Sequence, residues 1–423
     1  MDSIVQIDQS VYAAYHNHYP FYHTLLVRLF VVDIGMSLFK DANNAVMVYS
    51  VFQILSMSAI FAYICLTLYE AGVSKKWTIF AVLAYAFGGY HMMYSITMWK
   101  DVLFGGVVAL FLCALYRVLK GIGRKNGNYI LLVVGALGTC LLRSNGMAAF
   151  VLFFIILFFV LRKTEKKALW VLLGTLAMAV ILKYPVIKML NVPQPDMVEF
   201  LSIPEQQIAR LIADDVPLEE DEIEQLEKIA DLNRIKENYL FYLSDPVKNI
   251  LRQGNPQYLE EHKWDYFLLW LRLGLKHPGK YLEAWIDQTK GFWNGGYDFY
   301  VADVTVFQNS YGIELTVKDG ILSKPLKYWI NAFLSDPAFQ LFKAIGLHVW
   351  MIVLCGTICA MKKKRQGVMF LLPMAIILTL LITTPVFAEF RYAYGIFTSF
   401  PFLMLTFFTT SEPKQQKTVT DQV

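Results

Sequence analysis

The chain has 423 residues, of which 56% are hydrophobic and 15% aromatic, and its formal net charge is +4. Its mean hydropathy of +0.44 is far above that of a soluble domain of this length, which excludes the common classes of soluble enzyme. The composition predicts an all-α polytopic membrane protein. The excess of Lys and Arg lies in short loops, which match the headgroups of a lipid bilayer and do not suggest nucleic acid.

Residues 1–43 contain the closest cluster of potentially reactive side chains. Three of the seven histidines lie within eight positions, and Asp2 and Asp8 come just before them. Pro20 is well suited to begin a helix. Residues 21–39 form an amphipathic stretch interrupted by charges, and we expect this helix to lie along the outer surface of the membrane rather than to cross it.

The clustered histidines could also serve as metal ligands. His16, His18 and His23 could bind a divalent ion such as Mg²⁺ or Mn²⁺ together with a carboxylate, for which Asp101 is a candidate. Their spacing matches no strong metal signature. The sequence therefore leaves open whether a metal or no cofactor at all is needed.

Nine apolar runs that follow are candidates to cross about 30 Å of hydrocarbon. They cover residues 44–69, 78–95, 101–119, 129–142, 146–161, 168–190, 339–361, 368–387 and 395–409. The two runs that flank Arg143 are short, so we expect little tilt or a hairpin that only just reaches the far surface.

The basic loops set the orientation, since cytoplasmic loops hold an excess of Lys and Arg. Every second loop is basic, and so is the tail. This predicts five parts: a first extracytoplasmic loop (1–43), six spans (44–190), a large extracytoplasmic α-rich loop (191–338), three spans (339–410) and a cytoplasmic tail (411–423). With residues 1–43 outside, we expect either a further helix encoded upstream or translocation of a short tail.

The large loop divides by composition. From Asp214 to Leu232 it is acidic with apolar residues at helical spacing, which predicts an amphipathic helix lying over the membrane domain, with a solvated cap as the alternative. From Trp264 to Tyr300, aromatic and charged residues alternate. This pattern favours anchoring at the lipid interface, with stacking on sugar faces as the alternative.

The remaining outer turns hold charged residues at the ends of apolar runs: Lys100 and Asp101, Arg143 to Asn145, and Glu389 to Tyr392. A guanidinium at the edge of a span is costly unless it reaches water or an anion. Two arginines and a lysine that converge at one surface would bind a phosphate or pyrophosphate well. A helix cap at Asp101 and a purely structural charge network are the alternatives.

Several short motifs occur in a fixed order on this predicted outer face. They are Asp2-Ser3-Ile4-Val5-Gln6, His18-Tyr19-Pro20-Phe21-Tyr22-His23-Thr24, Lys100-Asp101, Arg143-Ser144-Asn145-Gly146 and Arg391-Tyr392. In these motifs the chain resembles bacterial members of the GT-C superfamily, which are membrane glycosyltransferases. The resemblance spans nearly the whole chain, although the first helix of such enzymes is absent and His18-Tyr19-Pro20 departs from their usual pattern.

The resemblance implies a GT-C-like bundle in a bacterial inner membrane, with its active site on the extracytoplasmic face. A sugar would pass from a polyprenyl-phosphate donor to a glycan, lipid or protein acceptor in one inverting step. It assigns the catalytic base to Asp2, with Asp8 as the other candidate, and places His18 and His23 beside it. The donor phosphate would be bound by Lys100, Arg143, Asn145, Glu389, Arg391 and Tyr392.

Two other classes of function stay open: a flippase or transporter for lipid-linked oligosaccharide, and a non-catalytic scaffold of envelope assembly. Transporters usually show related halves and polar residues near mid-membrane. The sequence shows no internal repeat, and its charged motifs lie at the predicted outer ends of the spans. This favours the enzyme.

Overall fold

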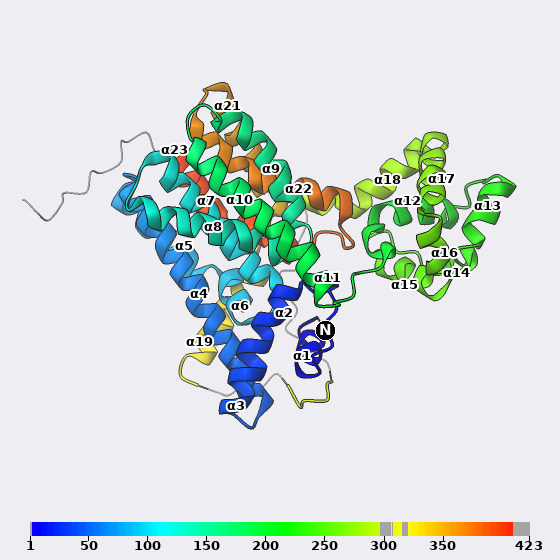
Figure 1. Cartoon of the computed structure of the whole chain (residues 1–423), viewed down its shortest axis with the longest axis horizontal. Helices are drawn as coiled ribbons and strands as arrows, with labels where there is room; N and C mark the ends of the chain where they lie inside the picture. The colour runs from blue at the N-terminus through cyan, green and yellow to red at the C-terminus, as the bar shows by residue number, and fades with distance from the viewer. Residues whose placement is uncertain (1, 297–305, 307, 315–319, 409–423) are drawn as a thin grey trace, which may run out of the picture.

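The computed structural model describes residues 2–296, 306, 308–314 and 320–408, and every regular element in these ranges is helical. The all-α prediction is therefore confirmed. Figure 1 shows a bundle of long helices and, beside it, a smaller helical body, which we call the cap. The cap comes from the large loop between the two groups of apolar helices.

The chain begins with one short helix and two longer ones, of which the first is made of three consecutive helical segments. Their bounds are α1 (Asp2–Val11), α2 (Phe21–Val27), η1 (Arg28–Gly35), α3 (Met36–Leu38) and α4 (Ala42–Glu70). From α2 to α3 the helix is continuous, and it packs along α4 (Figure 1), where Gly35 allows the two backbones to approach at Ala45. This segment, predicted to lie on the surface, is itself long and apolar enough to cross a membrane.

The rest of the bundle surrounds α7. Its helices are α5 (Lys75–Phe87), α6 (Gly89–Ile96), α7 (Lys100–Lys120), α8 (Lys125–Leu141), α9 (Gly146–Leu161), α10 (Lys166–Ile181), η2 (Leu182–Val186), α11 (Ile187–Met189), α21 (Ile345–Met361), η6 (Arg365–Phe370), α22 (Leu371–Thr383) and α23 (Phe390–Phe408). Because α7 is apolar on all sides, it is buried, with α8 and α23 packed against it.

Small residues let these helices approach closely, as is usual where lipid supplies no hydrophobic drive for association. A Cβ atom on Gly135 of α8 would lie 2.7 Å from the Cα of Phe111, and one on Gly105 would lie 2.7 Å from the ring of Tyr394. The close packing of α7 with both neighbours holds the first turn of α7 next to that of α23. This contact places Lys100 and Asp101 near Arg391.

The described residues contain five helices long and apolar enough to cross a membrane. The number rises to seven if two helix pairs, each bent by 47°, are counted as single spans. The structure thus supports a membrane-embedded helical protein.

The cap contains η3 (Met197–Phe200), α12 (Ser202–Ala213), α13 (Glu220–Glu227), α14 (Leu232–Asn238), α15 (Asp245–Gln253), α16 (Pro256–Glu261), α17 (Lys263–Lys276), α18 (Pro278–Thr289) and η4 (Lys290–Phe292). The chain returns to the bundle through α19 (Ser323–Ser335), η5 (Pro337–Phe339) and α20 (Gln340–Lys343). A separate hydrophobic core, to which Leu211, Leu226 and Leu269 belong, holds the cap helices together. Within the acidic stretch from Asp214 to Leu232, the helix that forms is α13, and α14 begins at the last residue of the stretch.

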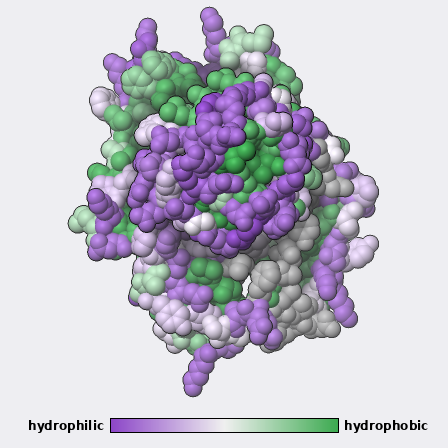
Figure 2. Space-filling view, turned by 90° about the vertical axis from the view of Figure 1, so that its right-hand side faces the viewer, coloured by the Kyte–Doolittle hydropathy of each residue, from purple (hydrophilic) through white to green (hydrophobic). Residues whose placement is uncertain are grey.

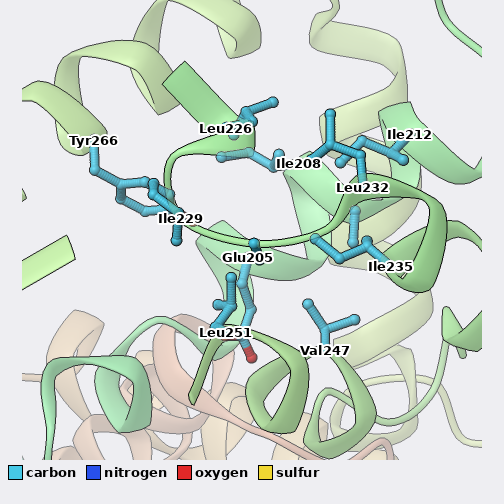
Figure 3. Close-up of a pocket in the computed structure, with 12 residues that line it drawn as sticks. Glu205, Ile208, Ile212, Leu226, Ile229, Leu232, Ile235, Val247, Leu251 and Tyr266 are labelled. Carbon is cyan, nitrogen blue, oxygen red and sulfur yellow. The ribbon is translucent and has the colours of Figure 1, made fainter. Parts of the chain in front are cut away.

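One carboxyl group, that of Glu205, lies inside the cap. Apolar side chains such as Ile208, Leu226 and Val247 line the pocket beside it (Figure 3), and neither of its oxygens has a hydrogen bond from the described residues. Burial raises the pKa of Glu205 well above its ordinary value, although Lys248 opposes this shift. Glu205 is therefore protonated in the folded chain at a pH where an exposed Glu is ionised.

We expect Glu205→Gln to stabilise the protein at pH 7.5 and to change little at pH 4. Above the ordinary pKa of Glu, the unfolded chain gains stability by ionising while folded Glu205 stays neutral, so the stability of the wild type falls as pH rises. The glutamine variant lacks this loss. Melting temperatures of both chains at the two pH values test the prediction, with Glu224→Gln on the exposed side of α13 as control. A gain that is equal at both pH values would contradict it.

Candidate functional site

The first helix, α1, lies over the N-terminal end of α7. Ser3 Oγ donates a hydrogen bond of 2.7 Å to the carbonyl oxygen of Met98, just before α7 begins. On the other side, Gln6 Nε2 lies 2.9 Å from His23 Nδ1 and 3.0 Å from Thr24 Oγ1 of α2. These contacts fix Asp2, at the start of α1, above the beginning of α7.

A buried ion pair joins α7 to the turn between α8 and α9. Arg143 Nε lies 2.9 Å from Asp101 Oδ1, and Arg143 Nη1 donates 3.0 Å to the carbonyl oxygen of Tyr392. The guanidinium carbon also lies 4.3 Å from the centroid of the Tyr392 ring. Asp101 is only 1% exposed, and its oxygens have no hydrogen bond of good geometry from the described residues. Arg143 is therefore the main compensation for a buried carboxylate.

A second ion-pair cluster is centred on Arg391. Its Nη1 lies 3.1 Å from Asp2 Oδ2, and its Nε lies 3.1 Å from Glu389 Oε1. The guanidinium carbon lies 4.9 Å from the centroid of the Trp99 ring. One arginine thus connects the first helix of the chain with the turn before α23, across nearly four hundred residues.

The two carboxylates beside Arg391 differ in proton affinity. Burial raises the pKa of Asp2, but the charges of Lys100 and Arg391 outweigh it and hold this pKa below its ordinary value. For Glu389, burial dominates and raises the pKa, although Arg391 opposes it. Asp2 is therefore ionised at neutral pH, and Glu389 gains a proton more readily than an exposed Glu.

Lys100 differs from the two arginines because its ammonium forms no hydrogen bond or ion pair with any described residue. It lies 5.4 Å from the centroid of the Tyr19 ring, and the charges of Asp2 and Asp101 act on it electrostatically. The first turn of α7 thus presents a cation without a fixed anionic partner in the described structure. A phosphate could be that partner.

Other residues singled out from the sequence lie apart from this cluster. Asp8 accepts a hydrogen bond of 2.7 Å from the Tyr311 hydroxyl, and His23 is buried against Tyr49. Asn145 donates 2.9 Å to Thr379 Oγ1 of α22. These positions support the surrounding helices rather than the cluster of charges.

The predicted metal ligands do not form a set. His16 Nδ1 accepts the backbone N–H of His18, and His18 Nδ1 lies 3.8 Å from Glu199 of the cap. Within the described ranges, no three His, Cys, Asp or Glu side chains are arranged to hold a metal ion. The carboxylates of Asp2, Asp101 and Glu389 face guanidinium groups instead.

The charged residues of the cap that face His18 escaped the sequence analysis. Arg252 pairs with Asp196 at 2.7 Å and with Glu199 at 2.7 Å, while the buried Lys248 lies 3.4 Å from Glu199. Burial lowers the pKa of His18, and the positive charges of Lys100 and Arg252 act in the same direction. No motif in the sequence marks these residues, because they come together only when η3 packs against α15.

Residues 10–421 match a family described as "Family of unknown function (DUF6020)". The chain belongs to the DUF6020 family. No curated protein and no solved structure matches it.

In this DUF6020 protein, the backbone connects the cap directly to the candidate site. The Ser244 N–H donates 2.9 Å to the Pro385 carbonyl oxygen, and the Phe387 N–H donates 2.9 Å to that of Tyr242. Gln288 Nε2 donates 2.8 Å to the same Pro385 oxygen. Because this turn continues into Glu389, the position of the cap is coupled to that of the Arg391 cluster.

Proposed function

We propose that this protein is a membrane glycosyltransferase that moves a sugar from a polyprenyl-phosphate donor to an acceptor outside the cytoplasm. The observation that carries the proposal is the cluster of Lys100, Arg143 and Arg391 with ionised Asp2 at one end of apolar, membrane-length helices. A lipid-linked donor keeps its chain in the bilayer and its phosphate at that level. The proposed setting is the extracytoplasmic face of a bacterial inner membrane, with nine spans.

The cations would bind the donor phosphate. Each arginine uses Nε and Nη1 in its described contacts, so the N–H groups of Nη2 are free to donate. Together with the unpaired Lys100, they would stabilise the charge that develops on the leaving phosphate in a poorly hydrated site. Glu389 and Tyr392 would position these groups, while Asn145, bonded to Thr379, would support the turn that carries Arg143.

The carboxylate of Asp2 would act as the base. The acceptor hydroxyl oxygen attacks the anomeric carbon, and its proton passes to Asp2. The bond between the anomeric carbon and the phosphate oxygen breaks, and the electron pair leaves with the phosphate. A single displacement of this kind inverts the configuration of the sugar. In this arrangement the guanidinium and ammonium groups supply positive charge to the leaving phosphate.

The deciding test is transfer by the purified chain in detergent, with lipid-phosphate donors of defined sugars and acceptors from the envelope. A transferase works without a sealed compartment, whereas a flippase or transporter gives no product there. The donor and product can first be identified by mass spectrometry of envelope glycans and glycolipids from cells with and without the gene. Absence of transfer in detergent, with transport of the same lipid in liposomes, would contradict the proposal.

The variant Lys100→Met tests whether Lys100 binds the donor phosphate. Because Lys100 has no hydrogen-bond or ion-pair partner among the described residues, we expect normal expression and melting temperature, but transfer slowed by about 10²- to 10³-fold, the usual cost of removing one group that stabilises a developing oxyanion. Lys40→Met, in the exposed turn before α4, is the control. Equal rates for the two variants would argue against phosphate binding at Lys100.

A further inference from the structure

The cap helix α17 is apolar on two opposite faces. One face, with Tyr266, Leu269 and Leu273, is buried in the core of the cap. The other face is exposed and runs the length of the helix, at spacings of three and four residues: Trp264, Phe267, Leu268, Leu271 and Leu275. Exposure is 70% for Trp264 and 75% for Leu275. An apolar stripe of this size on a folded domain marks a surface that a partner covers.

The surroundings of the stripe identify the partner. Tyr281 of α18 donates 2.9 Å to the Trp270 carbonyl oxygen, which fixes α17 to α18. Further along α18, Trp285 Nε1 donates 2.8 Å to the carbonyl oxygen of Leu381, near the outer end of the span Arg365–Thr383. Since α18 has 12 residues, it reaches about 18 Å. The stripe therefore begins within that distance of the end of a membrane-length helix.

The arrangement of the cap helices agrees with a position of the stripe near the end of a membrane-length helix. In Figure 1, α17 and α18 lie at the top of the cap, on the side of α9, α21 and α22, while α14, α15 and α16 lie at the bottom. The face of the cap turned away from the bundle is mostly hydrophilic around a central apolar patch (Figure 2). The exposed stripe thus lies on the part of the cap that α18 joins to the bundle, where an outer leaflet around the spans would lie in the membrane setting proposed above.

We propose that α17 is an interfacial helix, and that its exposed stripe rests in the boundary between headgroups and acyl chains of the outer leaflet. Trp264 is the type of residue that concentrates at this level, and the leucines supply buried apolar area. The helix would seat the cap on the bilayer and hold the turn before Glu389 at the level of a lipid headgroup. The inference depends on the membrane setting and not on glycosyl transfer.

Spin labels on single cysteines test it in the full chain. The five native cysteines are buried, so the unsubstituted chain serves as the labelling control. Leu268→Cys and Leu271→Cys place labels on the stripe, and Glu224→Cys places one on the exposed side of α13. The protein is reconstituted in phosphatidylcholine–phosphatidylglycerol liposomes, and collision of each label with oxygen and with a water-soluble nickel chelate is measured.

We expect the labels at positions 268 and 271 to collide preferentially with oxygen, which concentrates in the acyl region, and the label at 224 to collide preferentially with the nickel chelate. Equal ratios at 268 and 224 would overturn the proposal. Dipolar broadening at 268 that disappears on dilution with unlabelled chain would also overturn it, because a second copy would then cover the stripe. All three substituted residues are exposed, so the variants should fold like the parent, and their melting temperatures check this.

Discussion

Arg143→Gln should be among the most destabilising single substitutions in this chain. It leaves the carboxylate of Asp101 buried at 1% exposure without its ion-pair partner, and breaking a buried pair from one side costs about 3–5 kcal/mol. The Tyr392 carbonyl oxygen loses a hydrogen bond as well. Thermal unfolding in detergent should show a much lower melting temperature, and transfer should be lost.

The double variant Asp101→Asn, Arg143→Gln separates stability from function. Removing both charges removes the buried unpaired carboxylate, so we expect most of the lost stability to return. Transfer should stay low, because a donor phosphate still lacks the Arg143 guanidinium. If transfer returned together with stability, Arg143 would have a structural role alone and would not belong to the phosphate site.

Asp2→Asn should reduce transfer by about 10²- to 10⁴-fold with little change in the amount of folded protein, because an amide cannot accept the proton of the acceptor. Asp2 is at the start of α1 and partly exposed, so its contact with Arg391 contributes little to stability. Initial rates at saturating donor and acceptor measure the effect.

Asp8→Asn is the matched comparison, since the sequence alone left Asp8 as the other candidate base. In the structure Asp8 accepts a hydrogen bond of 2.7 Å from the Tyr311 hydroxyl and lies apart from the Arg391 cluster. We therefore expect this variant to retain most of its activity. If Asp8→Asn lost transfer while Asp2→Asn kept it, the two roles would be reversed. If both variants kept full transfer activity, neither carboxylate would be the catalytic base.

The sequence by itself determined the class of the protein and the approximate places of the long apolar helices. Composition and apolar runs predict a helical membrane protein, since hydrocarbon accepts only segments whose backbone hydrogen bonds are internal. The same runs place Lys100, Arg143 and Arg391 at or next to helix ends, because charged groups inside a span are expensive. These inferences need only the local chain.

The tertiary structure decided which charges meet. Asp2 and Asp8 lie on the same short helix and look equivalent in sequence, yet packing of α1 on α2 and α7 turns one to Arg391 and the other to Tyr311. The cap charges beside His18 and the exposed face of α17 likewise follow from long-range packing. The position of a residue in the sequence determines the face of the helix on which its side chain lies. Which other side chain it contacts depends on how distant segments of the chain pack together.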